Sequence, residues 1–126
     1  MTETTPAYKV IEEHMSEAEL QSLVIEIAHL YSWKVAHFRA CRTEKGWRTP
    51  VEADGKGFVD LVMVRPLERA RYIGDLGRVI FMELKREGGR VTEEQREWHR
   101  VLIEAGAEAY ICEPHDLDWM REVLLP

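Results

Sequence analysis

The stretch Phe-Val-Asp-Leu-Val-Met-Val at residues 58–64 decides the fold class of this chain. A nearly continuous apolar run of this length is typical of a central strand that is covered on both faces of a sheet. A second run, at residues 78–86, contains Val-Ile-Phe-Met and is predicted to form another strand. Each run carries an acidic residue, Asp60 in the first and Glu83 in the second, so candidate chemistry lies on the predicted sheet itself.

Helical and extended patterns alternate around these two runs, and polar caps mark where two of the helices begin. Ser16 with Glu19, and Thr92 with Gln95, have the three-residue spacing of capping boxes. The sequence predicts helices at residues 16–33, 92–106 and 114–124, and shorter strands at residues 34–40 and 109–112. The predicted order α-β-β-β-α-β-α is that of an α/β fold with a mixed central sheet flanked by helices.

The length of 126 residues corresponds to one compact domain, which we expect to span residues 16–126 behind a flexible N-terminal tail at residues 1–15. Residues 41–57 form a polar loop, and a loop of this length in a small domain is usually functional or disordered.

No apolar run approaches the roughly 20 residues of a membrane span. The N-terminus also lacks the pattern of a secretory signal, so we expect a cytoplasmic protein with no membrane partner.

Several classes of site are disfavoured by the sequence. Cys41 and Cys112 are too few for a disulfide scaffold and form no zinc pattern. The five histidines show no metal-ligand spacing, and we interpret them as structural or surface residues. The absence of a P-loop, a GxGxxG and a GxSxG stretch disfavours a nucleotidase or a serine hydrolase.

The charge is distributed unevenly along the chain. The formal net charge is −6, yet the segment from Arg39 to Arg90 holds twelve Lys and Arg against eight Asp and Glu. The remainder holds five basic and fifteen acidic residues. Since the local field governs where a polyanion binds, the basic middle is a candidate nucleic-acid surface, with ordinary solvated charge as the alternative.

Asp60 is the first candidate site residue, because a carboxylate inside an apolar strand costs several kcal/mol unless it is paired, hydrogen-bonded or bound to metal. The alternative is an Asp at a strand end that caps a loop amide. On the other strand, Glu83 and Lys85 share one side because side chains alternate with a period of two. Neighbouring strands lie about 5 Å apart, so both carboxylates could reach one Mg²⁺ or Mn²⁺, helped by the backbone carbonyl of Leu84. Lys85 would orient or deprotonate an attacking water, or neutralise developing charge.

Two predicted helices could add polar side chains to this site. Glu17 and Gln21 lie one turn apart on the flank of the first helix's apolar face, and Glu19 is a rival acid that equally suits the capping box. Gln95 lies in the first turn of the second helix, where its alternative role is again the capping box. The sequence leaves open which of Glu17, Glu19 or Gln21 completes the site.

Five short segments follow one another in a recognisable order. They are Ser-Glu-Ala-Glu-Leu-Gln at residues 16–21, Trp33 with His37, Gly-Phe-Val-Asp-Leu at 57–61, Phe-Met-Glu-Leu-Lys-Arg-Glu at 81–87, and Thr-Glu-Glu-Gln-Arg-Glu-Trp at 92–98. Together they resemble the VRR-NUC family of the PD-(D/E)XK nuclease superfamily, from residue 16 to the final helix. One residue departs from the family pattern. The usual proline before the aspartate is Val59, at a backbone-shaping position where we expect the chemistry to stay intact.

The resemblance implies a restriction-endonuclease-like PD-(D/E)XK core and a metal-dependent endonuclease. It implies catalytic roles for Glu17, Asp60, Glu83, Lys85 and Gln95, with Asp60 and Glu83 as metal ligands. Small stand-alone members from bacteria and phages resemble Holliday-junction resolvases, so we expect branched or double-stranded DNA as the substrate, in a bacterial or phage-infected cell. A four-way junction presents paired strands to cut, which suits a two-fold symmetric homodimer.

The loop at residues 41–57 supplies most of the candidate DNA contacts. Its basic residues would bind phosphates, and Trp47 could stack on an unpaired base, with packing against its own loop or a dimer partner as the alternative. The candidate DNA-binding residues are Arg42, Lys45, Trp47, Arg48, Lys56 and Arg86. Two other functions stay open: a nuclease that acts on flaps, ends or plain duplex, and a non-catalytic DNA-binding subunit with the same fold.

Overall fold

A computed structural model describes residues 4–38, 41–44, 46–48, 51–67 and 77–126 of the chain. The helices are α1 (Ala7–His14), α2 (Glu17–Leu30), α3 (Glu93–Glu104), the 3-10 helix η1 (Pro114–Asp116) and α4 (Leu117–Leu124). The strands are β1 (Lys34–His37), β2 (Cys41–Thr43), β3 (Gly46–Arg48), β4 (Leu61–Arg65), β5 (Arg78–Leu84) and β6 (Glu108–Cys112). In the described part of the chain, no helix combines the length and the apolar character that a membrane span needs.

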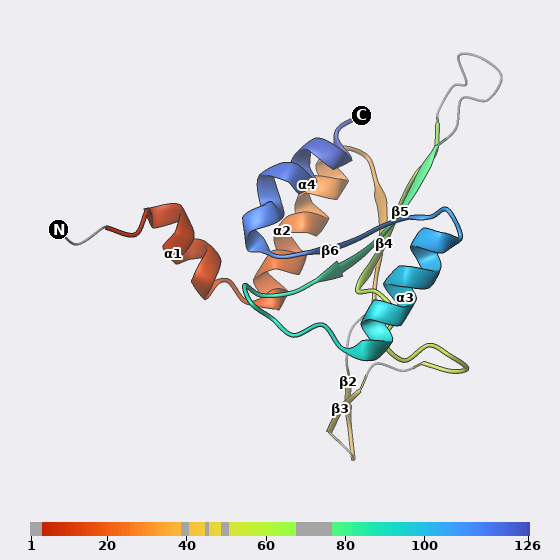
Figure 1. The fold of residues 1–126 in the computed structure, drawn as a ribbon. Helices are drawn as coiled ribbons and strands as arrows, with labels where there is room; N and C mark the ends of the chain where they lie inside the picture. The colour runs from red at the N-terminus through yellow and green to blue at the C-terminus, as the bar shows by residue number, and fades with distance from the viewer. Residues whose placement is uncertain (1–3, 39–40, 45, 49–50, 68–76) are drawn as a thin grey trace.

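A four-stranded mixed sheet with helices beside it forms the body of the molecule (Figure 1). Its strand order is β1-β4-β5-β6, with antiparallel pairing from β1 to β5 and parallel pairing between β5 and β6. The parallel pair is possible because α3 crosses from the end of β5 back to the start of β6. The mixed α/β architecture predicted from the sequence is therefore confirmed, with β4 and β5 as the two central strands.

One face of this sheet packs on α2 and α4 and forms the core. The register pairs Leu61 with Met82 and Met63 with Ile80, and all four side chains are fully buried. Burial of an aliphatic side chain of this size stabilises a fold by about 1.5–3 kcal/mol. The helices contribute residues spaced three or four apart, and these buried residues are Leu20, Val24 and Ala28 of α2 with Met120 and Leu124 of α4.

The opposite face is covered less completely. Phe58 makes edge-to-face ring contacts with Phe81 of β5 and Trp98 of α3, at centroid distances of 6.3 Å and 4.9 Å. Farther along the strands, Val64 and Val79 remain 38% and 44% exposed. The expectation that the run at residues 58–64 is covered on both faces is therefore only partly correct, because α3 packs mainly against β6.

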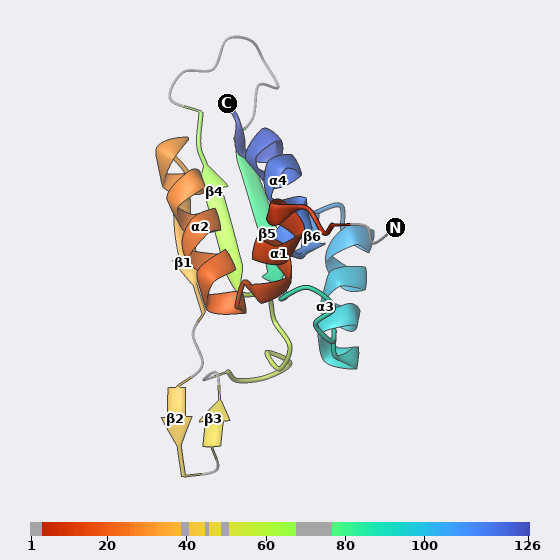
Figure 2. The same ribbon diagram turned by 90° about the vertical axis from the view of Figure 1, so that its left-hand side faces the viewer.

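Three elements lie where the sequence predicted irregular chain. The helix α1 occupies part of the stretch that was expected to be a polar tail, and its Tyr8 and Ile11 stay 60% and 62% exposed. This helix has eight residues and none of them is buried, so it lacks the packing that usually stabilises so short a helix. The strands β2 and β3 form an antiparallel hairpin within the predicted loop, and this hairpin projects away from the sheet (Figure 2).

The last turn of α4 is tied to one end of the sheet by three donors. Trp33 Nε1 and Arg65 Nη1 both donate to the carbonyl of Leu124, at 2.8 Å and 3.2 Å, and Arg78 Nη1 donates to the carbonyl of Val123 at 2.7 Å. Both guanidinium groups also lie over the Trp33 ring, 4.8 Å and 5.3 Å from its centroid. These contacts satisfy carbonyls that the end of a helix otherwise leaves without partners.

Candidate active site

The candidate site residues meet at the opposite end of the sheet from this C-terminal anchor. Asp60 stands one residue before β4, which begins at Leu61 and not at residue 58 as predicted. Its carbonyl accepts a 2.9 Å hydrogen bond from the amide of Phe38, which fixes its backbone beside β1. Lys85 follows the last residue of β5, and its amide donates to the carbonyl of Cys112 at 2.9 Å. Backbone hydrogen bonds to the segments after β1 and at the end of β6 therefore fix the positions of Asp60 and Lys85.

The carboxylate of Asp60 contacts β5 directly. Its Oδ2 accepts a 2.9 Å hydrogen bond from the amide of Leu84. The alternative considered for Asp60, an Asp at a strand end that caps a loop amide, is therefore only partly correct, because the amide belongs to the last residue of β5. The bond also places Asp60 beside Glu83, because Glu83 and Leu84 are consecutive residues of β5.

Two donors hold one oxygen of Glu83. Nε2 of Gln95 donates to Oε1 of Glu83 at 2.9 Å, and Nζ of Lys85 lies 3.6 Å from the same oxygen. Glu83 and Lys85 are only 4% and 7% exposed. The other oxygen, Oε2 of Glu83, is buried without a hydrogen-bond partner among the residues that the structure describes. An arrangement of this kind leaves one carboxylate oxygen available to a ligand.

Burial and neighbouring charge make this carboxyl group a weak acid. The pKa of Glu83 is raised from 4.5 to about 8, chiefly by burial, then by the negative charge of Asp60 and least by that of Glu17. The ammonium group of Lys85 acts in the opposite direction but does not compensate. Without a further positive charge, Glu83 therefore keeps its proton near neutral pH, and a bound cation would favour its charged form.

The three candidate residues of α2 differ in their surroundings. Glu19 completes a capping box with Ser16, because its Oε1 accepts from the Ser16 amide and its own amide donates to Ser16 Oγ at 3.1 Å. Glu17 acts electrostatically on Glu83, whereas Gln21 lies partly buried about one turn further along α2. These positions favour Glu17 as the acid that completes the site, and its role stays a prediction.

Gln95 combines the two roles that its position allowed. Its Oε1 accepts from the amide of Thr92 at 2.9 Å, and its own amide donates to Thr92 Oγ1 at 3.2 Å, so the predicted capping box is confirmed. Its Nε2 is then directed at Glu83. The cap orients the side chain that contacts the carboxylate.

The sequence did not reveal the packing role of Gly57, which determines how closely α3 approaches the site. It has a φ of +81°, which favours glycine, and a Cβ at this position would lie 2.6 Å from Cβ of Glu94 and 2.9 Å from the amide nitrogen of Gln95. The only signal in the sequence is a glycine just before Asp60, and such a glycine does not reveal which segment packs against it.

The candidate DNA-binding residues are described only in part. Lys45 lies outside the described residues, and of Arg42, Trp47 and Arg48 only the backbone, within β2 and β3, is described. Lys56 is exposed, and its Nζ lies 3.3 Å from Oε1 of Glu94, so its charge is partly compensated. Arg86 is exposed directly after Lys85.

The fold is that of a mixed α/β protein and is consistent with a nuclease-like fold. An acidic site lies at one end of its central strands. The family model of the VRR-NUC domain matches residues 3–116, and the chain belongs to this family. Membership implies a nuclease type of DNA-processing function, with DNA as the substrate. No curated protein and no solved structure matches the chain.

Proposed function

We propose that the protein is a metal-dependent, structure-specific DNA endonuclease of the Holliday-junction resolvase type. Its nuclease domain, residues 16–126, would have a restriction-endonuclease-like PD-(D/E)XK core, with α1 outside it. The observation that carries the proposal is the buried Oε2 of Glu83, which lacks a hydrogen-bond partner in the described part of the chain and belongs to a carboxyl beside Asp60. Leaving such a group unsatisfied costs about 1–3 kcal/mol or more, and a bound cation would offset that cost.

The donor set fits a hard divalent cation. The carboxylates of Asp60 and Glu83, with the backbone carbonyl of Leu84, would hold Mg²⁺ or Mn²⁺, since these ions prefer oxygen ligands. When bound, the cation would supply Lewis-acid stabilisation of the phosphate and activation of water. Metal-dependent hydrolysis of phosphodiester bonds is the chemistry that this donor set supports best.

The remaining side chains would position and balance the reacting groups. Lys85, buried beside Glu83, would orient the attacking water or neutralise the charge that develops on the phosphate. Gln95 would keep Glu83 in one orientation through its hydrogen bond. Glu17 would add an acid from α2 to the same site.

The β2–β3 hairpin offers a path for DNA to the candidate site. It leaves the sheet after β1 and returns through residues 51–59 to Asp60, so it emerges at the end of the sheet that carries the carboxylates (Figure 2). Arg42, Lys45 and Arg48 would contact phosphates there, and Trp47 would stack on a base at the branch point. Two such sites related by a two-fold axis in a homodimer would match the two strands that a resolvase cuts.

A cleavage panel tests this function. We expect the purified protein with Mn²⁺ to cut a labelled four-way junction faster than a flap, a Y-form or a plain duplex, and to cut none of them in a chelator. Asp60→Asn should abolish cleavage, whereas Asp54→Asn, a matched change at an exposed residue, should not. Equal cleavage by Asp60→Asn would disprove the site. Faster cutting of flaps, ends or plain duplex would support the alternative nuclease, and junction binding without any cleavage would support a non-catalytic subunit.

A further inference from the structure

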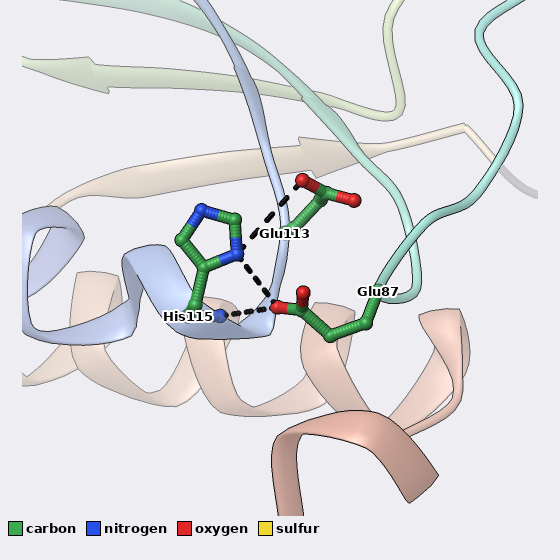
Figure 3. A group of neighbouring side chains, drawn as sticks. All are labelled: Glu87, Glu113 and His115. Atoms are coloured by element: carbon green, nitrogen blue, oxygen red, sulfur yellow. Dashed lines mark hydrogen bonds and ion pairs between the residues drawn. The ribbon is translucent and has the colours of Figure 1, made fainter. Parts of the chain in front are cut away.

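Glu87, Glu113 and His115 form a second group of potential ligands, which shares no residue with the candidate active site (Figure 3). One ligand atom from each residue lies within 4.8 Å of the others. Nδ1 of His115 is 2.8 Å from Oε1 of Glu87 and 3.8 Å from Oε2 of Glu113. In Figure 3 this nitrogen faces the two carboxylates, so the three side chains converge on one point.

Backbone donors hold both carboxylates of this group in place. The amide of His115 donates to Oε1 of Glu87 at 2.7 Å, and the amide of Gly88 donates to Oε1 of Glu113 at 2.6 Å. For Glu113 this leaves Oε2 directed at the imidazole. The side chains come from the β5–α3 connection, from the residue between β6 and η1, and from η1 itself, and they are already oriented toward one another.

Asp116 lies on the far side of the imidazole. Its Oδ1 is 3.3 Å from Nε2 of His115, and its Oδ2 accepts a 2.8 Å hydrogen bond from the amide of Glu113. A carboxylate beside the second ring nitrogen is the usual companion of a metal-binding histidine, because it favours the tautomer whose other nitrogen is free to bind the metal. Nδ1 would donate its proton to Glu87 in the metal-free group, and binding of a metal would displace that proton while Asp116 holds the one on Nε2.

We propose that Glu87, Glu113 and His115 bind a transition-metal ion of the Zn²⁺ type, with Asp116 as the outer partner of the histidine. One imidazole nitrogen and two carboxylate oxygens suit Zn²⁺, whose bonds to such atoms are about 2.0–2.2 Å long, which places ligand atoms roughly 3.4 Å apart. The observed separations from Nδ1 of His115 to the oxygens of Glu87 and Glu113, 2.8 Å and 3.8 Å, lie below and above that value. Because the His115 side chain is 50% exposed, water can complete the coordination.

The chemistry of the group separates it from the proposed catalytic cation. Mg²⁺ is bound through oxygen, whereas a nitrogen ligand favours Zn²⁺ and its neighbours among the transition metals. An ion at this position would connect the segment after Lys85 to the β6–α4 connection. Its expected effect is to stabilise the protein. The proposal does not depend on the nuclease function.

Zn²⁺ alone is the probe for the test, in a chain with Asp60→Asn and Glu83→Gln so that the candidate active site does not contribute. Calorimetric titration should show one equivalent of Zn²⁺ per chain, and Zn²⁺ should raise the Tm. Adding His115→Gln should remove that equivalent, whereas His29→Gln, at an exposed histidine of α2, should keep it. Asp116→Asn should weaken binding by about 10–100-fold.

Three results would overturn the proposal. The first is no Zn²⁺ binding, which would leave the group as an ion pair between His115 and its carboxylates. The second is Zn²⁺ binding that His115→Gln does not change, and the third is Mg²⁺ binding as tight as that of Zn²⁺. If the double variant does not fold, the same comparison is made in the otherwise wild-type chain. There His115→Gln should remove one Zn²⁺ equivalent, and an unchanged stoichiometry would disprove the site.

Discussion

Gln95 and Glu83 are joined by a 2.9 Å hydrogen bond in which Nε2 of Gln95 donates to Oε1 of Glu83. The same Gln95 side chain accepts from the amide of Thr92 and so completes the cap of α3. A single side chain thus links the start of a surface helix to a buried carboxylate. The orientation of that carboxylate depends on how α3 begins.

Gln95→Ala should reduce cleavage more than it reduces stability. Glu83 would lose its hydrogen-bond donor, and we expect single-turnover cleavage with Mn²⁺ to fall by about tenfold or more, equal to about 1.4 kcal/mol. Thr92→Ala is the control, because it costs about 1 kcal/mol of capping but keeps Gln95. Equal cleavage by the two variants would show that Gln95 serves the cap alone.

Glu83 should make the metal-free protein less stable as the pH rises. The pKa of its carboxyl is raised to about 8 in the folded chain from its ordinary value of 4.5, so the unfolded chain loses this proton first. The free energy of unfolding should therefore decrease between these two pH values. Denaturant titrations in a chelator should show this decrease. Glu83→Gln should reduce it, and Glu26→Gln, an exposed change on α2, should not. A profile that Glu83→Gln leaves unaltered would contradict this prediction.

Gly57→Ala should displace the first turn of α3. Gly57 and Gly106 both have positive φ, +81° and +86°, but only at Gly57 would a Cβ meet other atoms within 4 Å. Alanine at either position costs about 1–2 kcal/mol for its backbone conformation. Gly57→Ala should lower the Tm further than Gly106→Ala and should also slow cleavage. Matching Tm values and matching rates would show that the close approach at Gly57 is unimportant.

The basic residues of the hairpin should carry much of the affinity for DNA. Affinity should fall steeply with salt, because each phosphate contact releases counterions. The combined change Arg42→Ala, Lys45→Ala and Arg48→Ala should weaken binding and lower the slope of log affinity against log salt by about three. Lys9→Ala with Arg121→Ala, on α1 and α4, is the control. Equal losses in both proteins, measured by fluorescence anisotropy, would place the DNA face elsewhere.

Assembly can be measured separately from catalysis. We expect sedimentation to give a homodimer, since each chain offers one candidate site and a junction needs two incisions. Strand mapping should then place the two cuts symmetrically on a four-way junction. A monomer that nicks plain duplex as readily as a junction would disprove the resolvase proposal. The metal-dependent chemistry would then still be tested by the Asp60→Asn variant.

Local features of this fold were predictable from the sequence, and contacts between distant segments were not. The capping boxes at Ser16 and Thr92 depend on residues three positions apart, so the sequence displays them directly. The hydrogen bond from Leu84 to Asp60 joins residues 24 positions apart and depends on strand register. The residue types could suggest that Asp60 and Glu83 meet, but they could not show which Glu83 oxygen lacks a hydrogen-bond partner among the described residues.

The same limit applies to the second group of ligands. Glu87 and His115 are 28 positions apart, and no regular spacing connects them. Their approach follows from the parallel pairing of β5 with β6, which brings the ends of both strands together. His115 was interpreted as a structural or surface residue, because spacing along the chain alone gives no sign of this approach.

The anchoring of α4 by Arg65 and Arg78 determines where the protein can be labelled. Arg65 lies five residues along the strand from Asp60, or about 17 Å at the rise of an extended chain. A fluorophore or an immobilisation tag joined after Pro126 would therefore start at the far end of the sheet from the carboxylates. The chain can be attached to a surface through this end while the face that we propose for DNA binding points into solution.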